Sequence, residues 1–413
     1  MKLSIIKFPF ICSTLLILLI LLITLVPNSS YCSEKSEKIV IEGNKRTTNN
    51  HILFLIERCK KNNDLTLKQC LMNSRLFSSV EITSSKGRKQ TEITIKVKER
   101  WTLIPIPEIK LSSDNKSFGA FIIESNFLGI GKMLFIGAKT GNVEKAFFFF
   151  YKDRNLFYSE LTADAFFSKG SRNLKTYDKK DILYAFKESS QNISLRFGNN
   201  ISHDLSANLG IQQANITYNE ELYYHPPANY NFLSIGPELS YNQSNYKLYF
   251  NQGYSFRLNY LHQIHRSDNE SKSAKIEYSF IDQNNIYSNH VFQFRFSGMN
   301  LINSNLRDSI KTGGNIGYRG VQSGGLWLKS SQNLSIDYLI PFSTPNYGTW
   351  VLAPFTDYCM YKAYFNNHTD FLSTGIGSYL YLKNIALPGL GLVLGINKKF
   401  LNNFVSFSMG MGF

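Results

Sequence analysis

The last nine residues of the chain alternate between apolar and small polar side chains without exception. Serine or glycine stands between the five apolar residues, which are Val405, Phe407, Met409, Met411 and Phe413. Neighbouring side chains of a β-strand point to opposite faces, so this segment predicts a strand with one apolar and one polar face. Such a strand suits a wall with hydrocarbon outside and water inside, as in a transmembrane β-barrel.

The same alternation recurs through the C-terminal three quarters of the chain. It is clearest at residues 193–198, 274–280, 292–297 and 333–340. In one of these segments Lys275 and Glu277 alternate with apolar residues, and in another three phenylalanines alternate with polar residues. A soluble sandwich would have to bury the charged row or expose the aromatic row to water. Lipid outside and water inside removes both costs, and the mean hydropathy of −0.19 is compatible with such strands.

Sixteen candidate strands, with an uncertainty of two, follow residue 101, and an even number suits a single-chain barrel. They are 117–128, 131–141, 143–152, 156–168, 180–188, 192–201, 204–217, 231–241, 253–266, 272–284, 287–299, 331–341, 349–360, 370–382, 388–399 and 403–413. Residues 103–112 are either an irregular lead-in or part of the first strand. The long polar loops are expected outside the cell, at 169–179, 218–230 and 300–330.

The N-terminus has the layout of a secretory signal. Lys2 and Lys7 precede an apolar run at residues 10–26, and small or polar residues follow it. This pattern predicts a signal peptide over residues 1–32. An uncleaved membrane helix and a lipoprotein modified at Cys32 are the alternatives, and the bulky Tyr31 argues against the second. No other segment reaches the roughly 18 apolar residues that a membrane helix needs.

Residues 37–100 predict a separate small α+β domain. A strand at 38–42 is followed by a helix that Thr47 or Thr48 can cap, and by a second helix at 65–74. Two further strands are expected at 77–82 and 91–97, around a polar turn. Cys59 and Cys70 lie in the helical part, where export would permit a disulfide. Two free thiols are the alternative.

The sequence favours neither an enzyme nor a metal or cofactor site. It contains no Gly-x-Ser-x-Gly, Cys-x-x-Cys or His-Glu-x-x-His pattern, and no Ser/His/Asp set can be assembled. His262 and His265 are an odd number of residues apart, so they cannot share one strand face. We therefore expect no catalytic residue. The net charge of +15 is spread over strands and loops, without a basic helix, so nucleic acid is not an expected partner.

One glycine-rich loop can meet a carboxylate on the wall. Arg319 lies in the glycine-rich stretch 313–321, and the strand at 349–360 places Phe355, Asp357 and Cys359 on one face by period two. That face is the lumen if Trp350 and Leu352 meet lipid. The guanidinium group of arginine pairs bidentately with carboxylates, so Arg319 is expected to bind Asp357. An ordinary solvated loop arginine is the alternative.

Segments of the N-terminal domain resemble a polypeptide-transport-associated (POTRA) domain. The resemblance lies in the strand that ends in Gly43-Asn44, in Leu76-Phe77 followed by Val80, and in Val97 followed by Glu99. An unrelated α+β domain is the alternative.

Motifs in the barrel resemble the outer-membrane assembly superfamily of BamA-type and Sam-type insertases, Tam proteins and two-partner exporters. The loop motif of the family is matched by Tyr318, Arg319 and Gly320 with its flanking residues exchanged, and Phe355 and Asp357 match its wall motif. Cys359 stands where the family has glycine. Residues 126–131 resemble its first periplasmic turn, and residues 375–377 resemble its Gly-x-Gly strand.

The resemblance implies an outer-membrane barrel of a diderm bacterium, with the POTRA domain in the periplasm. It also implies a weak seam between 117–128 and 403–413, where Gly410, Gly412 and Phe413 end the chain. Unfolded outer-membrane or secreted polypeptides would bind the POTRA domain and the seam, and accessory periplasmic proteins could be further partners. The expected function is a specialised or accessory insertase or translocase. A dedicated two-partner exporter, which typically has a plug helix and two POTRA domains, and a passive channel or adhesin are the alternatives.

Overall fold

The computed structural model describes residues 38–413 except 61–65, 87–90, 113–114, 179–180, 224–227, 248, 269, 323, 365–368, 383–387 and 410–413. The predicted signal peptide lies outside the described residues, as do Gly410, Gly412 and Phe413. The chain packs as two compact units. One contains residues 38–40 and 83–94, and the other contains residues 41–82 and 95–413. None of the helices in the described ranges is long and apolar enough to cross a membrane.

The N-terminal region has the element order that the sequence predicts. The elements are β1 (Lys38–Glu42), α2 (Asn49–Lys60), α3 (Leu67–Asn73), β2 (Phe77–Lys86) and β3 (Thr91–Glu99), with sheet order β1-β3-β2. Thr66 caps α3 by accepting a hydrogen bond from the Gln69 amide. A disulfide joins Cys59 of α2 to Cys70 of α3, as proposed from the sequence.

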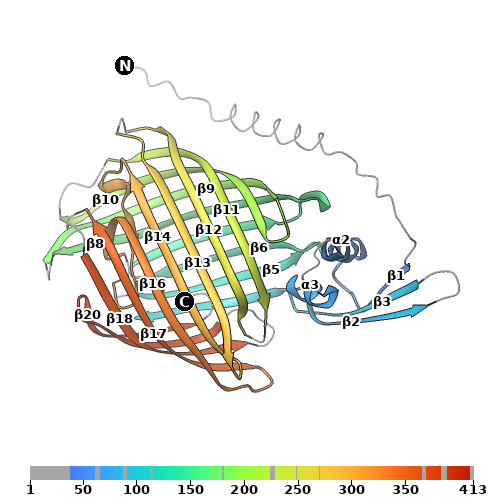
Figure 1. Ribbon diagram of the computed structural model, residues 1–413. Helices are drawn as coiled ribbons and strands as arrows, with labels where there is room; N and C mark the ends of the chain where they lie inside the picture. Colours follow the sequence, from blue (N-terminus) through green and yellow to red (C-terminus); the bar gives the residue numbers. More distant parts are fainter. Residues whose placement is uncertain are drawn as a thin grey trace. The chain divides into compact units, whose positions relative to one another are not determined.

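Within the described residues, sixteen antiparallel strands form a closed barrel wall (Figure 1). They are β4 (Leu103–Ser112), β5 (Lys116–Phe127), β6 (Lys132–Gly141), β7 (Glu144–Asp153), β8 (Leu161–Asp178), β9 (Asp181–Asn200), β10 (Leu205–Tyr223), β11 (Tyr230–Tyr246), β12 (Asn251–Arg266), β13 (Ala274–Tyr287), β14 (His290–Ile302), β16 (Leu326–Ser343), β17 (Gly348–Ala363), β18 (Thr369–Leu382), β19 (Pro388–Asn397) and β20 (Leu401–Met409). A 3-10 turn, η1 (Leu156–Tyr158), lies between β7 and β8. The connection from β14 to β16 holds η2 (Leu306–Asp308) and the short β15 (Ile310–Thr312), which pairs with β16.

The predicted strand count is correct, but two assignments behind it are wrong and compensate each other. Residues 103–112 form the first wall strand, β4, whereas the segments 180–188 and 192–201 form one continuous strand, β9. The predicted loop 169–179 belongs largely to β8, and much of the predicted loop 218–230 belongs to β10. A bilayer crossing needs only about 9–11 residues. These strands are longer, and polar residues on both faces, which suggested turns, are tolerated where a strand extends into water.

The wall separates apolar from polar side chains as the alternation predicts. In β19 the side chains of Leu392, Leu394 and Ile396 are 41–46% exposed, whereas Val393 and Asn397 between and beyond them are buried. The opposite face of the wall collects buried polar groups from several strands, including Ser335, Asp337, Asp357, Ser373 and Asn397. The outer face of the wall is therefore apolar, and the interior holds polar groups together with buried apolar residues such as Val393.

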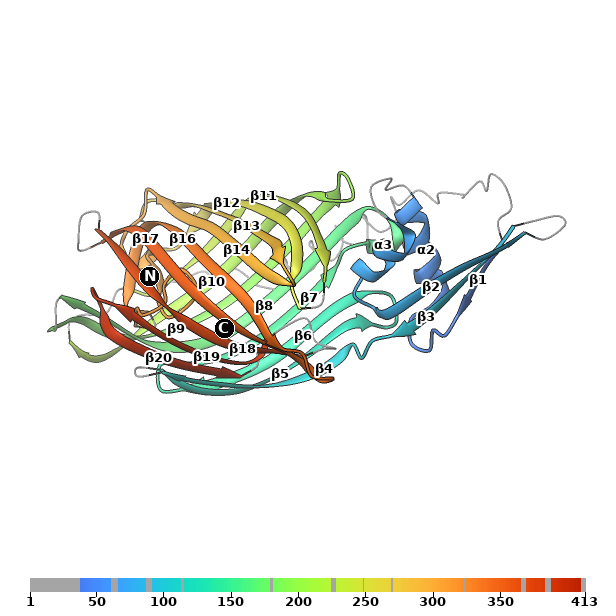
Figure 2. The ribbon, with the colours of Figure 1, turned by 60° about the horizontal axis from the view of Figure 1, so that its bottom comes forward.

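The barrel closes between β4 and β20, which are joined by four described residue pairs, from Ile109↔Met409 to Ser112↔Ser406. Figure 2 shows the red closing strands beside the blue-green first strands. The expected pairing of 117–128 with the last strand is therefore wrong, because β5 pairs with β4 and β6. Pro105 and Pro107 made β4 difficult to recognise, since proline is confined to strand edges and ends.

Candidate functional site

The connection between β14 and β16, residues 303–325, folds back against the inner wall, and we call it the inner loop. At Gly320 the inner loop packs against Asn397 of β19 and Phe404 of β20. The φ of Gly320 is +76°, a conformation that favours glycine, and a Cβ there would lie 2.7 Å from Asn397 Cβ and from the Phe404 ring. The glycine of the predicted motif therefore permits both the backbone conformation and the close packing.

Arg319 of the inner loop binds Asp357 of β17 through two hydrogen bonds. Its Nε donates to Asp357 Oδ2 at 2.6 Å, and its Nη2 donates to Oδ1 at 2.5 Å. The side chain of Asp357 is 0% exposed and that of Arg319 is 6% exposed. The predicted bidentate pair is thus present, and the alternative of a solvated arginine does not describe this residue. Enclosed pairs of this kind fix geometry, because losing one partner leaves a buried charge.

Two further groups on β16 and an aromatic ring on β17 complete the surroundings of the guanidinium group. Arg319 Nη1 donates to Asp337 Oδ1 at 2.9 Å, and Nη2 donates to Ser335 Oγ at 2.9 Å. The guanidinium carbon lies 3.6 Å from the centroid of the Phe355 ring. Phe355 therefore provides a cation–π surface, which explains why an aromatic residue suits this position.

The backbone of the inner loop is held as firmly as the side chain. The carbonyl oxygen of Arg319 accepts hydrogen bonds from Ser373 Oγ of β18 and from Asn397 Nδ2 of β19. The amide of Gly317 donates to Asp357 Oδ2 at 3.2 Å. One loop segment is thus connected to four consecutive strands, β16 to β19.

Tyr318 and Cys359 fill the space beside the Arg319–Asp357 pair. The Tyr318 hydroxyl is 2.6 Å from Ser331 Oγ and accepts from Asn333 Nδ2 at 2.8 Å. Cys359 is a free, fully buried thiol in the same apolar cluster as Tyr318. The side chain of Cys359 therefore occupies interior volume that a glycine would leave empty.

The sequence did not reveal four members of the latch, namely Ser335, Asp337, Ser373 and Asn397. Their only signal was a polar residue on the inner face of an alternating strand, and many wall residues share that property. We call the set of Arg319, Asp357 and these four residues the latch.

A second contact anchors the inner loop on a distant part of the wall. Lys311 Nζ of β15 donates to Glu188 Oε2 of β9 at 2.8 Å, and both side chains are almost fully buried. Arg172 of β8 also binds Glu188, through Nε at 3.0 Å and Nη2 at 2.7 Å. Because β15 pairs with β16, and β9 is several strands away in the wall, this contact crosses the barrel interior.

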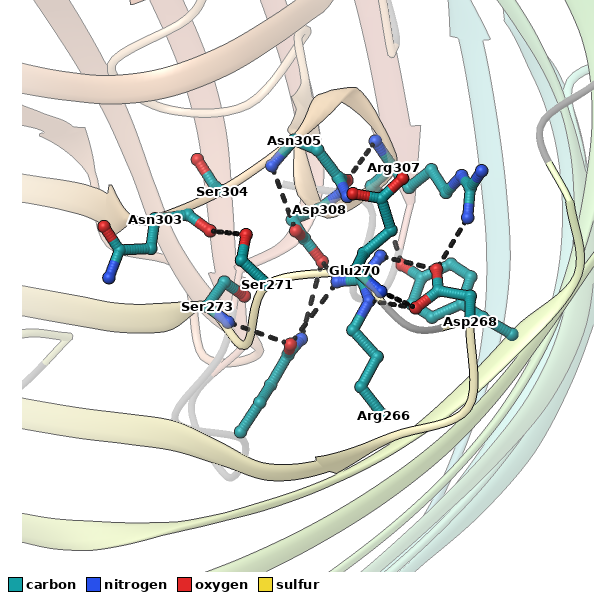
Figure 3. A network of polar contacts seen from close by, with 12 residues as sticks. Arg266, Asp268, Glu270, Ser271, Ser273, Asn303, Ser304, Asn305, Arg307 and Asp308 are labelled. Carbon is teal, nitrogen blue, oxygen red and sulfur yellow. Dashed lines mark hydrogen bonds and ion pairs between the residues drawn. The ribbon is translucent and has the colours of Figure 1, made fainter.

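A third anchor joins η2 to the β12–β13 connection (Figure 3). Arg266 donates to Asp308 Oδ1 at 2.6 Å and to both oxygens of Asp268, and Arg307 donates to Asp268 Oδ2 at 2.6 Å. The Arg266 guanidinium carbon lies 4.5 Å from the centroid of the Tyr230 ring. Burial raises the pKa of Asp268, but the hydrogen bonds and charge of Arg266 and the bond from Arg307 outweigh it and lower this pKa to about 2.

Within the larger compact unit, the N-terminal region contacts the turn between β5 and β6. Arg46 Nη2 donates to Glu124 Oε2 at 2.7 Å, and Asn126 Nδ2 donates to Thr47 Oγ1 at 2.9 Å. The Glu99 carboxylate accepts from the amides of three successive residues, Lys45 to Thr47. Burial raises the pKa of Glu99, but the hydrogen bonds from Thr47, Arg46 and Lys45 outweigh it, and the net pKa is below the ordinary value.

His51 of α2 is buried in the same contact. Burial lowers the pKa of His51 to about 4, although the charge of Asp153 opposes the shift. The imidazole is therefore neutral at pH 7. Gly131 lies against it, because a Cβ there would be 2.4 Å from His51 Nε2. The segment 126–131, which suggested a family turn, thus receives the start of the N-terminal helical region.

Among the described residues, no group of three or more His, Cys, Asp or Glu side chains could hold a metal ion. The arrangement at Arg319 instead fixes the position of a loop. Its charged groups pair with one another, and its hydrogen bonds connect backbone to wall.

No family model and no curated protein matches the sequence. Solved structures do match the fold. BamA from Haemophilus ducreyi, in a form lacking POTRA domains 1–3, has a TM-score of 0.57 at 15% identity over 92% of this chain and 85% of that chain. CdiB from Escherichia coli has a TM-score of 0.63 at 12% identity, with 91% and 76% covered, and CdiB from Acinetobacter baumannii has 0.57 at 12% identity, with 91% and 74% covered. The chain therefore has the barrel fold of BamA and CdiB.

Proposed function

We propose that this protein inserts or translocates polypeptides at the outer membrane of a diderm bacterium, as a specialised or accessory insertase or translocase. The observation that carries the proposal is the closure of the barrel between its first and last wall strands, β4 and β20. The likeness of the barrel to BamA and CdiB supports the same class of function.

A weak seam gives a barrel a way to act on another chain without a chemical step. An unpaired backbone group in hydrocarbon costs several kcal/mol, so a strand entering the membrane gains most by pairing with an available edge. Separation of β4 from β20 would expose such edges, and β-augmentation would then follow. The proposed activity requires no catalytic residue, nucleotide, metal or cofactor, and we propose none.

The N-terminal region is proposed to be a POTRA domain in the periplasm that receives the client. Its element order and the segments around Gly43, Phe77 and Val97 support this assignment. The inner loop opens from the end of the barrel opposite the β5–β6 turn, because successive strands run in opposite directions. In this proposal that end faces the cell exterior.

The latch is proposed to hold the inner loop in the position that the active barrel requires. Its support is the burial of Arg319, Asp337 and Asp357 together with the hydrogen bonds to four strands. A loop held by buried charges has one preferred position, whereas screened surface pairs contribute little.

Depletion of the protein in its host, followed by quantification of the outer-membrane and secreted proteomes, tests the function. An insertase predicts the loss of many barrel proteins, and a dedicated exporter predicts the loss of a single secreted protein. Unchanged proteomes would leave a channel or adhesin and contradict the proposal. The barrel itself is checked by gel mobility, since the unheated protein should migrate faster than the boiled one.

A further inference from the structure

A cavity of about 360 Å³ lies inside the barrel, between the inner loop and the wall strands β4 to β8. All five of these strands contribute to its lining, and Thr312, Asn315 and Gly324 of the inner loop form the other side. Asn115 and Val143, in the β4–β5 and β6–β7 turns, also line it, so the cavity lies towards the end of the barrel from which the inner loop opens. Ligand pockets in proteins have volumes of roughly 300–1,000 Å³, so this cavity is large enough to hold a small molecule.

One end of the cavity carries a buried carboxylate that accepts no hydrogen bond from a described residue. Glu108 of β4 lines the cavity and is 6% exposed. The charges of Lys139, Glu144 and Lys110 act on Glu108 from a distance only. Lys110 is itself engaged in another interaction. A buried carboxylate without a donor is costly, so a cationic donor that enters the cavity would be bound at this end.

The opposite end of the cavity has an excess of positive charge. Arg172 of β8 and Lys311 of β15 line it, and both pair with the same carboxylate, Glu188, which lies outside the lining. Arg172 binds Glu188 through Nε and Nη2, whereas its Nη1 has no acceptor among the described residues. Its side chain is 38% exposed. A guanidinium group held along one edge still presents donors to a second anion, so a carboxylate in the cavity would bind to Arg172.

Aromatic rings separate the two charged ends. Phe121 of β5 and Phe148 of β7 line the cavity, and their ring centroids are 6.4 Å apart. The Phe121 ring lies directly over Gly137, where a Cβ would overlap it, so the ring packs closely against the wall. Lys139 and Glu144 pair with each other in this middle part and add no net charge. An apolar group of a ligand would therefore lie between a negative and a positive end.

The distance between the two ends limits the length of the ligand. Four steps of about 4.8 Å separate β4 from β8 in the wall, which is about 19 Å along its surface. The side chains of Glu108 and Arg172 both extend into the concave interior, so a ligand has to bridge only part of this distance. An extended tripeptide is roughly 10 Å long and carries an ammonium group at one end and a carboxylate at the other.

We propose that this cavity binds a free zwitterionic peptide of about three residues. The ammonium group of the peptide pairs with Glu108, its carboxylate pairs with Arg172, and an apolar side chain packs on Phe121 and Phe148. Because the inner loop forms one side of the cavity, the bound peptide adds contacts between this loop and the wall. The proposal does not rest on the proposed function, since a channel or adhesin with the same interior would bind the same ligand.

The first experiment uses the wild-type protein alone. Full-length protein in detergent is titrated by calorimetry with the tripeptide Gly-Phe-Gly, with its N-acetylated form and with its C-terminal amide. Each blocked peptide lacks one of the two charges, so we expect its Kd to be at least tenfold higher than that of the free peptide. Absence of binding by the free peptide, or equal affinity for all three peptides, would overturn the proposal.

The second experiment assigns each charge to a residue. Glu108→Gln should weaken binding of the free peptide at least tenfold and leave binding of the acetylated peptide unchanged. Arg172→Met should weaken binding of the free peptide but not of the amide, while Lys311 still pairs with Glu188. Glu277→Gln is the matched control, because this carboxylate of β13 lies outside the cavity lining.

Gel mobility and the thermal transition show whether each variant has folded. Undiminished binding of the free peptide to a folded Glu108→Gln variant would overturn the assignment of Glu108. Equal losses in the Glu108→Gln and Glu277→Gln variants would indicate that the peptide responds to the general charge of the interior, and would overturn the site. If a variant does not fold, the three peptides and the wild-type protein still decide whether a zwitterion is bound.

Discussion

The wall at the latch and the wall at the seam are built from the same kind of strand but differ in what holds them. β16 and β17 share twelve described residue pairs, and the buried Arg319 adds ionic hydrogen bonds to both strands. β20 and β4 share four described pairs, next to two prolines. Among the described residues, the latch side of the barrel is therefore held by more interactions than the seam. In the proposed function, the seam opens and the latch side stays in place.

The largest effect is expected from a covalent lock across the seam. Leu111 and Phe407 are paired residues of β4 and β20, so Leu111→Cys/Phe407→Cys can form a disulfide. If the seam must separate, oxidation should abolish assisted folding of an outer-membrane barrel in liposomes, and reduction should restore it. The control Leu258→Cys/Tyr278→Cys links the paired strands β12 and β13 and should have no effect. A locked seam with full activity would exclude lateral opening.

Removal of the latch arginine should have the next largest effect. Arg319→Ala leaves the buried Asp357 without its cation and Asp337 with Arg295 alone, at a cost of about 3–5 kcal/mol. We expect the inner loop to become sensitive to added protease and activity to fall. Arg319→Lys should restore little, because an ammonium group cannot reproduce the bidentate geometry.

Arg257→Ala provides the comparison for this variant. Arg257 also pairs with a wall carboxylate, Glu238, but its side chain is 48% exposed. Its loss should cost less than about 1 kcal/mol. Equal behaviour of the Arg319 and Arg257 variants would contradict a special role for the latch.

The anchor across the interior should give an intermediate effect. Lys311→Met leaves Glu188 with Arg172 alone and should cost about 2–3 kcal/mol, because a buried carboxylate loses one partner. The released loop should raise ion conductance in planar bilayers. Lys311→Met/Glu188→Leu should cost less than the sum of the single changes, since no buried charge of the pair remains. Additive costs would indicate that Lys311 and Glu188 do not interact.

The smallest effect is expected from acid acting on the third anchor. The pKa of Asp268 is about 2 in the fold, below its ordinary value near 3.8, so its carboxylate stabilises the fold above pH 4 and this contribution is lost as pH falls toward 2. This contribution is on the order of 1–2 kcal/mol. Protease cleavage near residue 307 should therefore increase between pH 4 and pH 2 more in the wild type than in Asp268→Asn. An identical pH profile for the two proteins would contradict this anchor.

The alternation of the strands made the fold class readable from the sequence, while details of the wall were not. β4 was uncertain because it contains Pro105 and Pro107, and proline is unusual inside a strand. β9 was divided because polar residues around Ser190 lie on both faces of a strand longer than a bilayer crossing. In both cases the local pattern was real, but its meaning depended on where the strand lies in the wall.

The candidate site was partly predictable for a related reason. Arg319 and Asp357 could be paired because arginine and a strand-facing carboxylate complement each other. Ser373 and Asn397 could not be assigned, since their hydrogen bonds go to the backbone carbonyl of Arg319. Backbone groups are identical at every position, so a sequence does not indicate which side chain will find them. Lys311 and Glu188 also required the fold, because 123 positions separate them along the chain.

By itself, the sequence determined that one face of each strand is apolar and the other polar, because side-chain chemistry and the two-residue period are local properties. It also determined that residues 105 and 107 are prolines, which lack an N–H group, and that a glycine follows Arg319. Only the tertiary structure decided that β4 is the edge that meets β20, and that one loop crosses the interior to three parts of the wall. Closure of a barrel brings together groups distant in the chain, and the hydrogen bonds and buried charges of these long-range contacts exist only once the wall is complete.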